Sequence, residues 1–147
     1  MKHANQIPKP TVKRSIKKSL SHVKKDTWVL FSKYIRLRDC LKTTGCTSFG
    51  LCITCGKRYH LKLLQAGHFI SRSYLATRWD TDNVKNQCVG CNIFGGGKPL
   101  DFEENLRSEL GNKRVDALKK KRHEITILTP NWYEERIVMY KELLKNL

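Results

Sequence analysis

Apolar side chains recur every three or four residues near the start of the chain, which is the spacing of one face of an α-helix. In DTWVLFSKYIRLRD, Trp28, Phe31 and Ile35 fall on one face. Asp26 is a good N-cap residue, and we expect the helix to end near Cys40. The opposite face carries basic side chains that either face solvent or contact a nucleic-acid backbone: Lys33, Arg36 and Arg38.

The last third of the chain also has helical periodicity. One predicted helix ends at Gly111, and its apolar positions are Leu100, Phe102, Leu106 and Leu110. Val115 and Leu118 mark a second helix, and Thr129 followed by Pro130 is a typical start for a third. The third has an apolar stripe formed by Trp132, Tyr133, Ile137, Tyr140, Leu144 and Leu147. We expect this stripe to pack in the core, with a dimer interface as the alternative.

The middle of the chain has shorter patterns. LKLLQAGHFIS is typical of an extended segment that ends near His68, and SRSYLATRWDTDN has no clean period, which indicates a long loop. NVKNQCVGCNIF can start a helix, which the glycines at 95–97 would end. Helices flanking a small strand-containing centre predict an α+β fold.

Charge narrows the choice of partners. The chain has 147 residues and a formal net charge of +16, with the excess in the first hundred residues. Such a field attracts polyanions, so DNA, RNA or an anionic membrane surface are candidates. No window approaches the roughly 20 apolar residues of a membrane span. The polar amino terminus does not resemble a secretory signal, so we expect a reducing cytoplasm.

Composition also suggests the domain organisation. Residues 1–25 hold eight basic side chains, two prolines and few large apolar groups, which predicts a flexible basic arm. Residues 26–147 then form one domain, with a core at about 48–100 and a helical region at 101–147.

Cysteine spacing gives the strongest chemical signal. Two C-x-x-C pairs, separated by 32 residues, are formed by Cys52, Cys55, Cys88 and Cys91. This spacing is typical of a structural zinc site with four thiolates, which leaves no position for a catalytic water. Disulfides or a redox pair are the alternatives. Cys40 and Cys46 have no assigned role.

Between the cysteine pairs lie His68 in QAGHF and Asn83 in TDNV, and Asn92 follows the last cysteine. This order resembles the zinc-containing HNH, or ββα-metal, endonucleases, which include the resolvase endonuclease VII. FSKYIRLRDC, CITCGK, AGHFISR and RWDTDNVKNQCVGCN resemble the NinG/Rap family of phage recombination endonucleases, over roughly residues 27–147.

The resemblance implies a zinc-stapled ββα-metal core with flanking helices and metal-dependent hydrolysis of DNA. His68 would be the general base, Asn83 would orient the loop, and Asn92 would bind a catalytic Mg²⁺ or Mn²⁺ ion. Many HNH enzymes have a metal-binding Asp or His directly before the base, where this chain has Gly67. Candidate replacements are Asp80, which we favour, Asp82 and Asp101. Arg72, Arg78 and Lys98 would contact phosphates, or are plain surface charge.

The resemblance further implies branched or recombination-intermediate DNA, such as Holliday junctions or D-loops, as substrate. A homodimer, recombination proteins as partners and the host cytoplasm are the corresponding expectations. The main alternative is a zinc-stabilised nucleic-acid-binding module without cleavage activity, because Gly67 could mean an inactive site. A basic structural protein without site chemistry is a third possibility.

Overall fold

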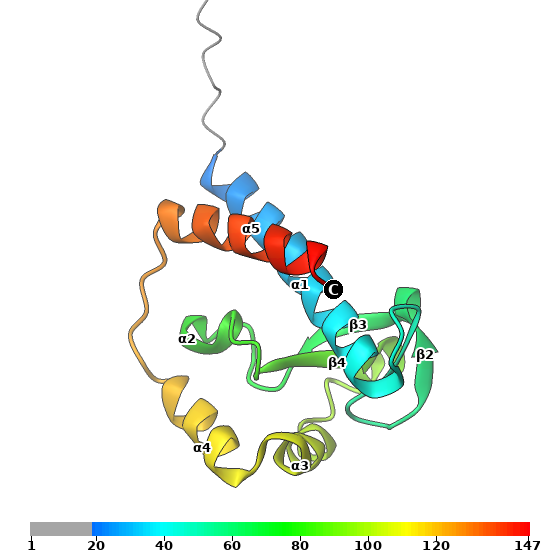
Figure 1. Ribbon diagram of the computed structural model, residues 1–147. Helices are drawn as coiled ribbons and strands as arrows, with labels where there is room; N and C mark the ends of the chain where they lie inside the picture. The colour runs from blue at the N-terminus through cyan, green and yellow to red at the C-terminus, as the bar shows by residue number, and fades with distance from the viewer. Residues whose placement is uncertain (1–18) are drawn as a thin grey trace, which may run out of the picture.

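A long helix, α1 (Leu20–Thr44), runs across the molecule and contacts strands of both sheets and the last helix in the computed structural model, which describes residues 19–147 (Figure 1). Ser19 caps it by accepting a hydrogen bond from the backbone of His22, and Gly45 ends it with a φ of 72°. The helix is therefore longer at both ends than the sequence pattern predicted. Of the expected arm at 1–25, residues 1–18 lie outside the described residues, and the rest belong to α1 or its cap.

Two antiparallel pairs of strands follow α1. The order is β1 (Phe49–Leu51), β2 (Arg58–His60), the 3₁₀ turn η1 (Leu61–Leu63), β3 (Leu64–His68), helix α2 (Leu75–Arg78), β4 (Val84–Cys88) and the short π-helix η2 (Gly90–Phe94). β1 pairs with β2, and β3 pairs with β4 in a register that sets His68 opposite Val84. The two halves of the centre are joined where the Ile53 N–H donates to the Asn86 carbonyl, at 2.8 Å.

The expectation of a helix starting in NVKNQC was wrong, because this segment is the strand β4. All five of its residues are buried, so its sequence lacks the polar-apolar alternation of a half-exposed strand. Within NVKNQCVGCNIF, the helical element is η2, which is capped by Gly95. The segment expected to be one long loop contains α2.

Three helices complete the described chain: α3 (Pro99–Leu110), α4 (Asn112–Lys121) and α5 (Pro130–Lys145). Gly111 follows α3, and the Thr129 hydroxyl accepts a hydrogen bond from the Trp132 N–H at the start of α5, both as the sequence predicted. Leu100 differs from the predicted stripe, since its side chain is 83% exposed.

The apolar core has two centres. One joins α3 and α4 to the end of the β3 segment through Ile70, Phe102, Leu106, Val115 and Leu118. The other joins α1, β4 and α5 through Phe31, Ile35, Val84 and Tyr140. Tyr133 on α5 is also buried, so Tyr133 and Tyr140 of the predicted stripe pack inside the protein, whereas Leu147 is 42% exposed. Strand β4 is therefore held from one side by α1 and α5.

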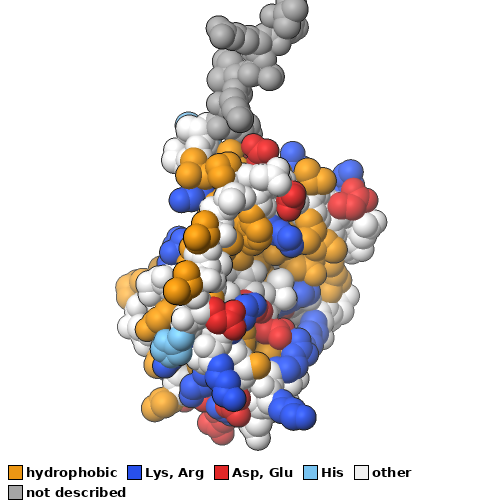
Figure 2. All heavy atoms as spheres, turned by 90° about the vertical axis from the view of Figure 1, so that its left-hand side faces the viewer, with side chains coloured by type: hydrophobic (Ala, Val, Ile, Leu, Met, Phe, Trp, Pro, Cys, Tyr) orange, Lys and Arg blue, Asp and Glu red, His pale blue; other side chains and the backbone are white. Residues whose placement is uncertain are grey.

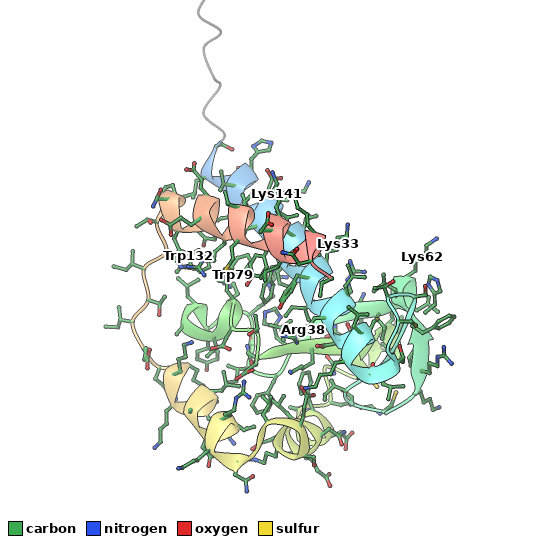
Figure 3. The ribbon with its side chains drawn as sticks, in the orientation of Figure 1. Lys33, Arg38, Lys62, Trp79, Trp132 and Lys141 are labelled. Carbon is green, nitrogen blue, oxygen red and sulfur yellow. The ribbon has the colours of Figure 1, made fainter. Side chains whose placement is uncertain are left out.

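A buried polar joint anchors α1 to β4. Asp39 is 5% exposed, and its carboxylate accepts hydrogen bonds from the Asn86 backbone at 2.9 Å and from Arg38 Nε at 2.7 Å. The Arg38 guanidinium also donates to the carbonyls of Thr81 and Val84. Arg38 thus lies between α1 and β4, whereas Lys33 is exposed on the same helix (Figure 3).

No helix within residues 19–147 is both long and apolar enough to cross a membrane. Acidic and basic side chains are interspersed on the face that carries α4 and the segment leading to α5 (Figure 2). Three ion pairs contribute to this mixture: Arg114 with Asp82, Lys121 with Asp80, and Lys119 with Glu103.

We predict that Arg38→Ala lowers the free energy of unfolding by roughly 2–3 kcal/mol, because it removes the charged partner of buried Asp39 and leaves two backbone carbonyls without a donor. Urea unfolding followed by circular dichroism measures the change. Lys33→Ala, on the exposed face of the same helix, is the matched control and should change stability by less than about 0.5 kcal/mol. Equal effects of the two substitutions would contradict the anchoring role of Arg38.

Candidate functional site

Four cysteines converge from two parts of the chain. Cys52 and Cys55 belong to the turn between β1 and β2, Cys88 ends β4, and Cys91 lies in η2. Their sulfur atoms all lie within 4.8 Å of one another. The turn closes where the Gly56 N–H donates to the Cys52 carbonyl, and Gly56 has a φ of 68° that other residues rarely adopt.

These sulfurs fit a tetrahedral metal ion. Zn–S bonds of about 2.3 Å place thiolate sulfurs about 3.8 Å apart, which agrees with the observed cluster. Although burial opposes ionisation, hydrogen bonds from the Cys91 backbone and the Tyr59 hydroxyl lower the pKa of Cys88 to about 7. The cluster therefore suits a structural zinc ion. Among residues 19–147 it is the only group of three or more His, Cys, Asp or Glu side chains arranged to hold a metal.

A cleft of about 770 Å³ opens beside this centre, between α1, β3 and the loop after η2. His68 and Asn92 both line it, as do Arg36 and Arg72. The cleft therefore brings together four of the residues that the sequence singled out, from four separate segments.

His68 stands at the end of β3 with a defined orientation. Its Nε2 lies 2.9 Å from the Arg78 carbonyl oxygen, and its ring stacks on Trp28 with centroids 5.6 Å apart. Because a carbonyl can only accept, Nε2 carries the proton and donates it, which leaves the Nδ1 lone pair as the base. Burial lowers the pKa of His68, and the charges of Arg72 and Arg78 act in the same direction. The ring is therefore neutral at neutral pH.

Asn83 is fully buried and holds the loop after His68. Its Oδ1 accepts from the Ile70 N–H at 2.7 Å, and its Nδ2 donates to the carbonyls of Ile70 and Thr77 at 3.0 Å. The Phe69 N–H also donates to the Asn83 carbonyl. Asn83 therefore ties the segment after β3 to the start of β4, which is an orienting position and not one in the cleft lining.

Asn92 lies on η2 and faces β3. Its Nδ2 donates to Gln65 Oε1 at 2.8 Å, so the Asn92 Oδ1 is left as an acceptor in a cleft that both residues line. Sequence reasoning missed Gln65, together with Lys62 and Trp28, which also line the cleft. A polar residue within LKLLQAGH was the one available signal for Gln65. Nothing in the pattern distinguished Trp28 from the other core aromatics.

Gly67 leaves no room for a metal-binding side chain. A Cβ atom at this position would lie 2.0 Å from the Gln87 Oε1. Gln87 is itself fully buried and donates to Thr54 Oγ1 and the Gly97 carbonyl. The Gln87 side chain therefore occupies the space that an Asp or His at position 67 would need.

The three candidate acids lie outside the cleft lining. Asp80 pairs with Lys121 at 2.6 Å and accepts from the Asp82 N–H, while Asp82 pairs with Arg114 at 2.7 Å. Asp101 is exposed in the first turn of α3. Asp80 and Asp82 thus anchor α4 to the loop before β4, and the described cleft lining contains no carboxylate.

Only some of the residues that were expected to bind phosphate line the cleft. Arg36 and Arg72 line the cleft, and Arg78 lies behind it, where its Nε donates to the Arg72 carbonyl. Arg38 is occupied by Asp39, and Lys33 and Lys98 are exposed but outside the cleft lining. Lys62 adds a cation at the rim of the cleft, and its side chain points outward from η1 (Figure 3).

Comparison with known proteins gives one match. The family model described as Bacteriophage Lambda NinG protein matches residues 2–147. The comparisons with curated proteins and with solved structures returned no match. The family match includes every cysteine of the cluster and every residue named in the cleft.

We predict that Cys88→Ser abolishes zinc binding and prevents cooperative thermal unfolding, because three thiolates no longer close the shell that joins the turn at 52–55 to β4. Zinc content per chain and a circular-dichroism melt measure the two effects. Cys46→Ser is the matched control, since Cys46 lies outside the cluster, and it should retain one zinc ion per chain. A folded, zinc-loaded Cys88→Ser protein would contradict the structural role of the cluster.

Proposed function

Because the chain belongs to the family of the bacteriophage lambda NinG protein, we propose that it acts in phage recombination as a metal-dependent HNH endonuclease that cleaves DNA. The proposal includes branched DNA, such as Holliday junctions or D-loops, as the substrate. It also includes a homodimer and recombination proteins as partners. Two antiparallel strands followed by a short helix, with His68 at the end of the first strand, support the ββα-metal assignment.

One observation carries the proposal: the His68 imidazole binds a carbonyl through Nε2, has no hydrogen-bond partner for Nδ1 among residues 19–147, and lies in the same cleft as two guanidinium groups. Phosphodiester hydrolysis needs a base for the attacking water and positive charge around the phosphate. His68 supplies the first, and Arg36 and Arg72 supply the second. A purely structural histidine would have no need of a cationic cleft.

The residues divide the reaction between them. His68 Nδ1 takes a proton from water as the water oxygen forms a bond to phosphorus and the bond from phosphorus to the 3′ oxygen breaks. Arg36 and Arg72 stabilise the negative charge that develops on the phosphate oxygens, and solvent protonates the leaving oxygen. Asn83 and the Arg78 carbonyl hold the imidazole in the required orientation.

The oxygen atoms available as metal ligands in the cleft of His68 fit a weakly held divalent cation. Asn92 Oδ1 is a hard oxygen ligand without a hydrogen-bond donor, and Gln65 is its neighbour. Mg²⁺ or Mn²⁺ bound there would neutralise charge on the scissile phosphate. The favoured second ligand from the sequence, Asp80, is engaged by Lys121, so we propose that amide oxygens and the substrate phosphate complete the shell.

A zinc-stabilised DNA-binding module without cleavage activity is the second candidate. Gly67 and the absence of a carboxylate from the described cleft lining favour it, since most metal-dependent nucleases bind their catalytic ion through a carboxylate. The two candidates share the cationic cleft and the zinc site and differ in the role of His68.

We predict that the protein nicks a labelled four-way junction in Mg²⁺ or Mn²⁺, and that His68→Ala reduces the rate by about 10²–10⁴-fold while DNA binding stays within about threefold. Gel analysis of nicking and fluorescence anisotropy measure the two quantities. His60→Ala is the matched control, because His60 lies on β2, outside the cleft lining, and it should retain the wild-type rate. Tight binding without nicking in any metal would favour the binding module.

The rate of nicking should fall on the acid side with a midpoint below pH 6.5. His68 accepts a proton only when neutral, and burial lowers its pKa from the ordinary value of 6.5. The neutral base is therefore present above the lowered pKa and is lost as the pH falls through it. Arg72→Gln should move the midpoint to higher pH, since it removes a positive charge beside the ring. A midpoint at or above 6.5 in the wild type would contradict this environment for His68.

A further inference from the structure

A second pocket lies directly behind the cleft. It has a volume of about 330 Å³, and its lining consists of four cationic and three aromatic side chains: Lys24, Lys25, Arg72, Arg78, Trp28, Trp79 and Tyr133. No acidic side chain lines it. We call it the rear pocket.

Trp28 and Arg72 form a shared wall between the cleft and the rear pocket, since both residues line both spaces. The Arg72 guanidinium carbon lies 5.3 Å from the centre of the Trp28 ring, and that ring stacks on His68. The cleft and the rear pocket are therefore adjacent.

The cations of the rear pocket have no carboxylate partner in the part of the chain that the structure describes. Within residues 19–147, none of its four lysines and arginines forms an ion pair with a carboxylate. In contrast, Arg114, Lys119 and Lys121 on α4 are each paired with an acid. Like charges held together without counter-charge favour an anionic occupant, because the occupant releases counterions and relieves their repulsion.

The aromatic residues indicate which anion. Trp79 packs edge-on against Trp28 at 6.0 Å and against Tyr133 at 5.8 Å, and Lys24 Nζ lies 5.8 Å from the Tyr133 ring centre. Trp79 and Trp132 lie toward one another between α2 and α5 (Figure 3). Cations that track a backbone, combined with aromatic rings that accept bases, are typical of sites for single-stranded nucleic acid.

We propose that the rear pocket binds an unpaired nucleotide of the DNA strand that leaves the cleft, with its phosphate at the lysines and arginines and its base against the aromatic lining. The inference rests on the proposed function and deepens it. A base inside a duplex is stacked and paired on every side, so it cannot enter. A branch point offers free nucleotides, which gives a physical reason for a preference for branched DNA over linear duplex.

The pocket also contacts the catalytic side chain. The Arg78 carbonyl accepts the hydrogen bond from His68 Nε2, and Trp28 stacks on the same ring. Arg78 and Trp28, which line the rear pocket, thus set the orientation of the His68 ring, the proposed general base. Occupation of the pocket and the position of His68 are therefore linked through direct contacts.

Intrinsic fluorescence tests the inference without any cleavage. All three tryptophans of the chain, Trp28, Trp79 and Trp132, belong to this aromatic cluster. We expect single-stranded tetrathymidylate to change the fluorescence at low salt, without added Mg²⁺ or Mn²⁺. In Lys24→Ala/Lys25→Ala the apparent affinity should fall by roughly tenfold, because two phosphate contacts are lost.

The matched control is Lys113→Ala/Lys141→Ala, which removes the same charge from exposed lysines that form no ion pair within residues 19–147 and line neither the cleft nor the rear pocket. Both pairs are exposed helix positions, where alanine preserves folding. Equal affinities of the two double variants for tetrathymidylate would overturn the inference, as would the absence of any fluorescence change in the wild type.

Anisotropy with a linear duplex and the same duplex carrying a single-stranded flap gives the second measurement. Lys24→Ala/Lys25→Ala should lose affinity for the flapped DNA by roughly tenfold relative to the control, and lose little of it for the duplex. An equal loss for both DNAs would overturn the inference. If the wild type prefers the flapped DNA but nicks no DNA, the nuclease proposal is contradicted, while the proposal for the rear pocket is retained.

Discussion

The sulfur cluster is the constraint on which the rest of the structure depends. It joins the turn at 52–55 to the end of β4 and to η2, with all four sulfurs within 4.8 Å of one another. Without a cation, the four thiols in this space could not all ionise, because thiolates so close repel one another. A zinc ion held by these sulfurs would fix η2 against β3, where Asn92 donates a hydrogen bond to Gln65 at the edge of the cleft. The cysteine cluster thus adjoins the cleft through η2.

Strand β4 receives support from the opposite direction as well. The Asp39 carboxylate bonds its backbone, and Phe31 and Ile35 of α1 pack on Val84. Because both ends of the β3–β4 pair are held, His68 at the end of β3 has a defined position relative to α1. Trp28 of that helix then stacks on the imidazole and separates the cleft from the rear pocket. Helix α1 therefore contributes both to the core and to the proposed reaction site.

Charge is used in two ways in this molecule. On the C-terminal helices, basic side chains are paired with acids that hold α4 in place, and Asp80 and Asp82 belong to this structural set. Around His68, the cations have no carboxylate partners among the described residues. Burial lowers the pKa of the imidazole, and the charges of Arg72 and Arg78 act in the same direction. Paired and unpaired basic side chains are therefore separated in space within residues 19–147.

The sequence by itself determined the local features. Cysteine spacing predicted the cluster of sulfur atoms, and Gly111 and Thr129 predicted where helices end or begin. The order of His68, Asn83 and Asn92 singled out three candidate side chains, of which His68 and Asn92 line one cleft. Tertiary structure decided the rest, because burial and partner choice depend on residues distant in sequence. It made NVKNQC a strand covered by α1, paired Asp80 with Lys121, and filled the space at Gly67 with Gln87. It also placed Trp28, 40 residues before His68, against the ring, a contact that no local pattern encodes.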